Sequence, residues 1–74
     1  RDSEGATADR AVTLTVKEAV QHLPERLRTS VILYYYGDLS VGQIARQIGT
    51  SEGSVKRYLF EARAKLATIL EGAR

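Results

Sequence analysis

Basic side chains recur at helical spacing near the C-terminal end of the chain, where they form a candidate nucleic-acid contact. Lys56, Arg57 and Arg63 follow two serines, and two aromatic side chains and one acidic side chain lie between Arg57 and Arg63. Arginine can hydrogen-bond guanine through two N–H groups, while lysine and serine commonly hold phosphate oxygens. The candidate DNA-binding residues are Ser51, Ser54, Lys56, Arg57, Phe60, Glu61 and Arg63.

On a helix, some of these side chains point directly away from the core. Apolar residues that lie within about 40° of one direction form the expected buried stripe, and they are Val55, Leu59, Ala62 and Leu66. Arg57 and Phe60 point to the opposite side. Arg57 is therefore the best candidate for reading a base, the alternative being a solvated surface arginine. Phe60 either touches a thymine methyl or, in a rotated helix, joins the core.

The remaining candidates suit the DNA backbone better than the bases. Lys56 and Arg63 lie on one flank of the helix and are expected to contact phosphate. Ser51 and Ser54, with nearby backbone amides at the helix start, can also hold a phosphate, although capping the helix is the favoured role of Ser51. Glu61 lowers the positive charge beside the groove, where it can accept a hydrogen bond from a cytosine amine or be repelled by phosphate.

These side chains require a short helix and a tight turn in front of their own helix, and the preceding segment has the residues for both. Ser40 predicts an N-cap, and Gln43 can complete a capping box. Gly49 predicts a turn in the left-handed backbone conformation, which carries no steric cost for glycine. Helices are therefore expected over 41–48 and 52–71. Together they predict a helix-turn-helix whose second helix enters the major groove of DNA.

Two further helices are expected upstream of the motif. The first covers about Arg10–His22, and the second covers about Pro24–Tyr36 and is closed by Gly37. Residues 1–9 have the polar, small composition of a linker end, so the domain is expected over 10–74. The expected core residues of these helices are Val12, Val16, Ala19, Val20, Leu23, Leu27, Val31, Leu33 and either Tyr34 or Tyr35.

The predicted fold class is all-α, because no segment alternates with the period of a strand. It has four helices, ends in the helix-turn-helix, and falls in the winged-helix-like DNA-binding class without a wing.

The chain has 74 residues and a net charge of only +2, so its total charge is weak support for nucleic-acid binding. Residues 40–74 nevertheless carry six basic and three acidic side chains, against five and six in residues 1–39. A surface that binds DNA needs such an excess of positive charge, although an ordinary solvated charged face explains the excess equally well.

Composition also excludes several classes of function. The chain has no cysteine, which rules out disulfides and thiolate metal sites and fits a reducing cytoplasm. No apolar run approaches the roughly 20 residues that span a bilayer, so no membrane insertion is expected. Nucleophile triads, paired carboxylates and glycine-rich phosphate loops are all missing from the sequence. We therefore expect a protein that is not an enzyme and that uses neither a cofactor nor a metal.

The segment Leu23–Leu66 resembles region 4 of the sigma-70 family of RNA polymerase sigma factors, in particular the extracytoplasmic-function (ECF) members. The matching residues are Leu23-Pro24, Gly37-Asp38-Leu39-Ser40, Gln43-Ile44-Ala45, Gly53-Ser54-Val55-Lys56 and Ala62-Arg63 with Leu66. Many regulators share the helix-turn-helix. The Leu-Pro-Glu-Arg start of the second helix and the long last helix are more specific to sigma factors.

The resemblance implies a partner set as well as a fold. A domain of this kind is expected to recognise the minus-thirty-five element of a promoter in the cytoplasm, to dock on the β flap of core RNA polymerase, and to be held inactive by an anti-sigma factor. Many relatives carry arginine at the position of Tyr58 and a basic residue at that of Glu61. The resemblance therefore does not imply which promoter sequence this chain prefers.

Two other functions compete with this interpretation. One is the DNA-binding domain of a LuxR-type response regulator. The Leu-Pro-Glu-Arg start of the second helix and the length of the last helix argue against this function. The other is a protein-interaction module that binds an anti-sigma factor or the polymerase flap and has lost DNA binding through Tyr58 and Glu61. Binding to DNA with and without polymerase distinguishes these functions.

Overall fold

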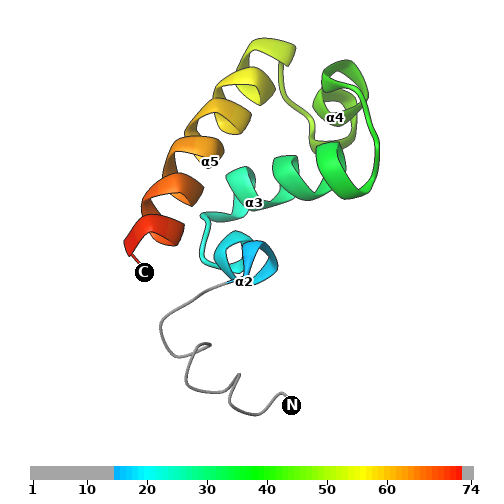
Figure 1. The fold of residues 1–74 in the computed structure, drawn as a ribbon. Helices are drawn as coiled ribbons and strands as arrows, with labels where there is room; N and C mark the ends of the chain where they lie inside the picture. Colours follow the sequence, from blue (N-terminus) through cyan, green and yellow to red (C-terminus); the bar gives the residue numbers. More distant parts are fainter. Residues whose placement is uncertain (1–14, 73–74) are drawn as a thin grey trace.

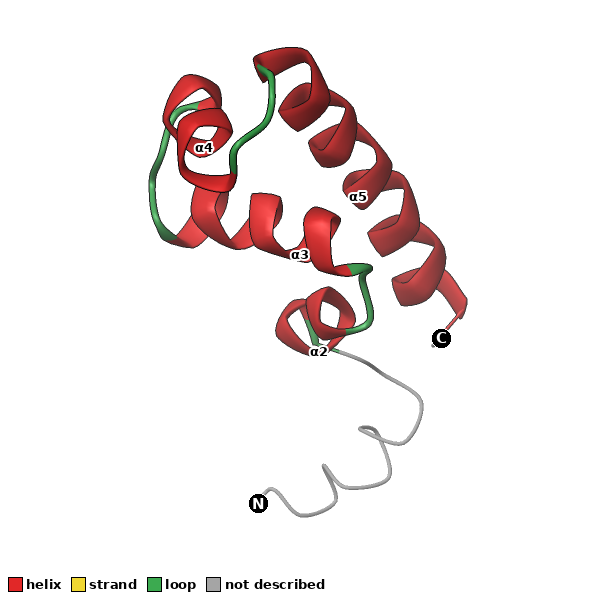
Figure 2. Ribbon diagram, turned by 180° about the vertical axis from the view of Figure 1, so that it is seen from behind, coloured by secondary structure: helices red, strands yellow, loops and turns green. Residues whose placement is uncertain are grey.

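The computed structural model describes residues 15–72, which form four α-helices and a π-helical turn with no β-strand among them. The elements are α2 (Val16–Gln21), α3 (Glu25–Val31), the π-helical η1 (Ile32–Tyr36), α4 (Val41–Ile48) and α5 (Glu52–Gly72). The all-α prediction is confirmed. Figures 1 and 2 show α2 and α4 at opposite ends of the α3–η1 rod, and α5 packs against α2, α3 and α4.

Helix α2 begins with a capping box at Thr15. The Glu18 N–H donates to the Thr15 hydroxyl at 3.1 Å, and the Thr15 N–H donates to the Glu18 carboxylate at 3.0 Å. The sequence predicts a single helix over 10–22, but Thr15 caps α2 with extended backbone and α2 ends at Gln21. Residues 1–14, including Val12, lie outside the described residues. The prediction that Val16 is a core residue is wrong. Its side chain is 54% exposed, since α2 buries its second turn rather than its first.

Helix α3 begins one residue later than predicted, because Pro24 occupies the N-cap position with extended backbone. The regular α-helix ends at Val31, and residues 32–36 continue as a π-helical turn. The N–H of Gly37 closes that turn by donating to the carbonyl oxygen of Ile32 at 2.9 Å. Of the two tyrosines proposed for the core, Tyr34 is half-buried against it, whereas Tyr35 is 53% exposed.

The helix-turn-helix has nearly the predicted bounds. The Gln43 N–H donates to the Ser40 hydroxyl at 3.1 Å, and the Ser40 N–H donates to the Gln43 amide oxygen at 2.8 Å, which confirms the capping box. Gly49 has φ 73° and ψ 45°, the left-handed conformation expected from its place in the turn. Helix α5 extends one residue beyond the predicted end.

A single apolar core joins the helices. Its buried members are Ala19, Val20, Leu23, Leu27, Val31, Ile44, Ala45, Val55, Leu59 and Ala62. Ala45 is only 4% exposed between α4 and the rest of the core, so its small side chain allows close approach of the motif helices. The core fixes the rotation of α5, and with it the direction of every candidate DNA-binding side chain.

Candidate nucleic-acid interface

The rotation of α5 is set by side chains that are almost fully buried. Val55, Leu59 and Ala62 are 0, 3 and 0% exposed, as the sequence predicted. The side of α5 opposite to them is open: Arg57 is exposed, and Phe60 is 72% exposed. The alternative in which helix rotation buries Phe60 is therefore wrong. An arginine and an aromatic ring face solvent together on the first turns of α5, the part of a recognition helix that reaches base edges.

The start of α5 is capped by Ser51. Its hydroxyl oxygen accepts the N–H of Ser54 at 3.1 Å and donates to the Ser54 hydroxyl at 3.0 Å. The favoured capping role of Ser51 is thus present in the structure. The backbone amides at this end carry the positive end of the helix dipole, which favours an anion such as a DNA phosphate.

Arg57 has two neighbours on its own helix. Its Nε lies 3.9 Å from a carboxylate oxygen of Glu61, and its guanidinium carbon lies 5.5 Å from the ring centroid of Tyr58. The Arg57 and Glu61 side chains are 60% and 47% exposed, so solvent screens the ion pair and it contributes little to stability. Arg57 can therefore leave Glu61 for another acceptor at small cost.

Arg63, on the same flank of α5 as Lys56, reaches the η1 end of the α3–η1 rod. Both side chains are exposed, and the Nε of Arg63 donates to the Tyr35 hydroxyl at 2.8 Å. The Arg63 guanidinium carbon also lies 5.7 Å from the centre of the Tyr35 ring. Sequence reasoning missed this pairing, because the residues are 28 positions apart and nothing in their local spacing links them.

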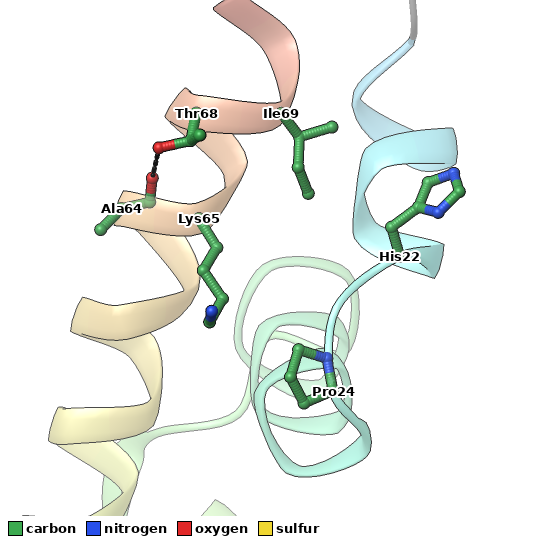
Figure 3. A pocket seen from close by; sticks show the side chains of 6 residues that line it. All are labelled: His22, Pro24, Ala64, Lys65, Thr68 and Ile69. Carbon is green, nitrogen blue, oxygen red and sulfur yellow. Dashed lines mark hydrogen bonds between the residues drawn. The ribbon is translucent and has the colours of Figure 1, made fainter. Parts of the chain in front are cut away.

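The opposite end of α5 borders a hollow that lies away from the candidate DNA-binding residues. Lys65 and Ile69 extend from α5 toward the turn between α2 and α3, where His22 and Pro24 form the other wall (Figure 3).

Residues 15–72 hold no group of three or more histidine, aspartate or glutamate side chains that could bind a metal ion. Across the same residues, no helix is long and apolar enough to cross a membrane.

The structure thus brings six of the seven candidates onto or beside one surface. Ser51, Ser54, Lys56, Arg57, Phe60 and Glu61 lie within the first turns of α5 or at its cap. Arg63 lies further along and reaches toward η1.

Comparison with known proteins shows which family this chain is similar to. The sequence matches the family model described as sigma-70, region 4, over residues 13–66. It is also 34% identical over 64 residues to the ECF RNA polymerase sigma factor SigM of Mycobacterium tuberculosis, in each of two strains. The alignment covers 86% of this chain and 33% of the relative, so the chain spans about a third of the length of the curated relatives it matches. No solved structure matches it.

Proposed function

The chain belongs to the sigma-70 region 4 family, and from this premise we propose that it recognises the minus-thirty-five element of promoters during transcription initiation. Region 4 of a sigma factor is a DNA-binding regulatory domain, so the chain is not an enzyme. In the proposed complex, the first turns of α5 lie in the major groove. The observation that carries the proposal is the exposed Arg57–Phe60 face, which lies directly opposite the buried stripe of α5.

The side chains of that face have separate roles in the proposal. Arg57 leaves the screened contact with Glu61 and donates two hydrogen bonds to a guanine, while Phe60 packs on a neighbouring thymine methyl. Lys56, Arg63 and the capped start of α5 hold phosphates and fix the register of the helix. Phosphate contacts carry no sequence information directly, so base preference rests on the Arg57–Phe60 face.

Protein partners complete the proposed function. The net charge of +2 is small for a DNA-binding domain, and non-specific binding comes mainly from neutralised phosphates. We therefore expect the chain alone to bind DNA weakly, with a steep loss of affinity as salt rises. The family resemblance supplies the β flap of RNA polymerase as the partner that holds the domain on the promoter, an anti-sigma factor as its inhibitor, and the cytoplasm as its location.

A binding experiment with and without polymerase tests the proposal. A pool of random duplexes is incubated with the chain alone, or with the chain and purified core RNA polymerase, and the bound DNA is sequenced. We expect a short preferred motif only when polymerase is present. Tight binding of a preferred site without polymerase would instead indicate an independent regulator of the LuxR type. Failure to enrich any DNA in either condition would indicate a module that binds only proteins.

A further inference from the structure

The contact between Arg63 and Tyr35 links the recognition helix to the end of the α3–η1 rod. The Arg63 Nε donates to the Tyr35 hydroxyl at 2.8 Å, and the guanidinium carbon lies 5.7 Å from the centre of the ring. Tyr35 is 53% exposed, so this contact lies on the surface. A hydrogen bond in water adds little to stability, because both groups find water partners in the unfolded chain.

The geometry leaves most of the Arg63 guanidinium available for a ligand. The hydrogen bond to Tyr35 uses the Nε proton, and the two terminal NH₂ groups carry four further donors. Arginine loses side-chain entropy when it binds a phosphate, and a prior contact at Nε removes part of that loss. Tyr35 thus prepares Arg63 for an anion while remaining outside the contact itself.

The position of Arg63 points to the class of anion. Arg63 and Lys56 occupy one flank of α5, seven residues apart, which corresponds to about 10 Å along a helix. They therefore lie on the same side of the exposed Arg57–Phe60 face. Basic side chains that flank the base-reading face of a recognition helix meet the DNA backbone.

We infer that Tyr35 is a positioning residue for DNA binding: it holds Arg63 so that the terminal guanidinium groups grip a backbone phosphate beside the major groove. The inference rests on the proposed function and deepens it. It extends the DNA-binding machinery from α5 to η1, a segment that contains none of the DNA-binding candidates predicted from sequence. Tyr35 itself touches no DNA in this arrangement.

A double-mutant cycle on the 74-residue chain tests the inference. Tyr35→Phe removes only the hydroxyl, Arg63→Ala removes the guanidinium, and the double variant combines them. Tyr36→Phe is the matched control, because Tyr36 is 64% exposed and its hydroxyl has no hydrogen bond to the described residues. Affinity for a fluorescent random-sequence duplex is measured by anisotropy across a salt series, since a phosphate contact does not depend on the promoter sequence.

We expect Tyr35→Phe to weaken binding by about two- to tenfold, the range of one lost hydrogen bond, with Tyr36→Phe unchanged. Arg63→Ala should lower the salt slope by about one unit. In the Arg63→Ala background, Tyr35→Phe should have no further effect, because the tyrosine acts only through the arginine. Equal losses from Tyr35→Phe in both backgrounds, or no loss in either, would overturn the inference.

Two further readouts separate this role from a structural one and from failure of the proposed function. Nuclear magnetic resonance of the free chain should show slow exchange of the Arg63 Nε proton, which Tyr35→Phe abolishes; fast exchange in the wild type overturns the inference. Thermal unfolding should be almost unchanged in Tyr35→Phe. A lower melting temperature with an unchanged salt series assigns the contact to stability alone. If the wild type binds no duplex at low salt, either alone or with core polymerase, the proposed function itself fails, and the inference fails with it.

Discussion

The Nε of Arg57 lies 3.9 Å from a carboxylate oxygen of Glu61, one turn further along α5. The Arg57 and Glu61 side chains are 60% and 47% exposed, so solvent screens the ion pair and the attraction is weak. The pair lies on the surface that is proposed to contact DNA. In the proposed complex, Glu61 therefore competes with DNA for Arg57 and adds a negative charge near the phosphates. Its removal should change DNA binding more than it changes the fold.

Glu61→Gln should tighten binding to random-sequence duplex DNA by about two- to fivefold at low salt, because one exposed charge interaction is worth about 0.2–1 kcal/mol. The gain should fade as salt rises, since it is electrostatic. Glu71→Gln, about 15 Å further along the helix, makes the same charge change and should have little effect. Fluorescence anisotropy titrations measure the DNA affinity of the wild type and of both variants. Weaker binding by Glu61→Gln would show that the carboxylate accepts a hydrogen bond from the DNA.

Gly49→Val should destabilise the domain by about 1–2 kcal/mol, the penalty for a side chain in the left-handed conformation. Gly49 has φ 73°, and a Cβ built on it meets no atom within 4 Å, so the cost is conformational rather than steric. Gly49→Asn is the matched variant and should lose less, because asparagine tolerates this backbone conformation. Chemical denaturation measures the difference. Equal stability of the valine variant and the wild type would contradict the assigned conformation.

Gly37→Ala should also destabilise the domain, but for lack of space. Its φ of −86° suits any residue, yet an added Cβ would lie 2.8 Å from the carbonyl oxygen of Leu33. Either η1 or the loop after it must shift, at a cost of about 1–3 kcal/mol, as for other overpacked sites. Gly37→Asn should give no relief, unlike the same change at Gly49. Denaturation of both variants tests this, and a fully stable Gly37→Ala would show that the π-helical turn relaxes freely.

Ser30→Ala should leave the domain equally stable or stabilise it by up to about 1 kcal/mol. The Ser30 side chain is 0% exposed, and its hydroxyl has no hydrogen-bond partner among the described residues. A buried, unpaired hydroxyl costs free energy, and alanine also favours helix. Thr29→Ala at the neighbouring, half-buried position serves as the control. A loss of more than about 1 kcal/mol on Ser30→Ala in denaturant unfolding would reveal a partner for the hydroxyl.

Local signals in the sequence predicted much of this structure. The capping box at Ser40, the left-handed Gly49 and the buried stripe from Val55 to Ala62 all follow from residue type and spacing, and all are present. The start of α5 follows from the cap at Ser51. The stripe places Phe60 on the side away from the core, but the sequence left open a rotation that buries it, and the structure decides for exposure.

Other features depend on contacts between distant segments. The π-helical turn at Ile32–Tyr36 has no residue pattern that distinguishes it from an α-helix, and it is closed by a hydrogen bond from the Gly37 N–H to the Ile32 carbonyl oxygen. Val16 has helical spacing from Val20, but tertiary packing covers only the second turn of α2. The pairing of Tyr35 with Arg63 spans 28 positions and requires the fold.

The proposed function requires that the Arg57 face of α5 reads bases while the flank with Lys56 holds the DNA backbone. Its most direct test compares Arg57→Ala with Lys56→Ala in the presence of core polymerase, scoring each against a library of promoter sequences. Lys65→Ala is the matched control, because Lys65 extends from α5 toward the turn between α2 and α3 (Figure 3). Neither test residue is buried, so both variants should keep their fold.

Arg57→Ala should cost about 1–3 kcal/mol in specific binding and relax the preference at one base pair. Lys56→Ala should weaken all sequences alike and lower the salt slope by about one unit, and Lys65→Ala should bind as the wild type does. If instead Lys56→Ala alters base preference while Arg57→Ala leaves every preference intact, then the Arg57 face does not read the promoter and the account is wrong.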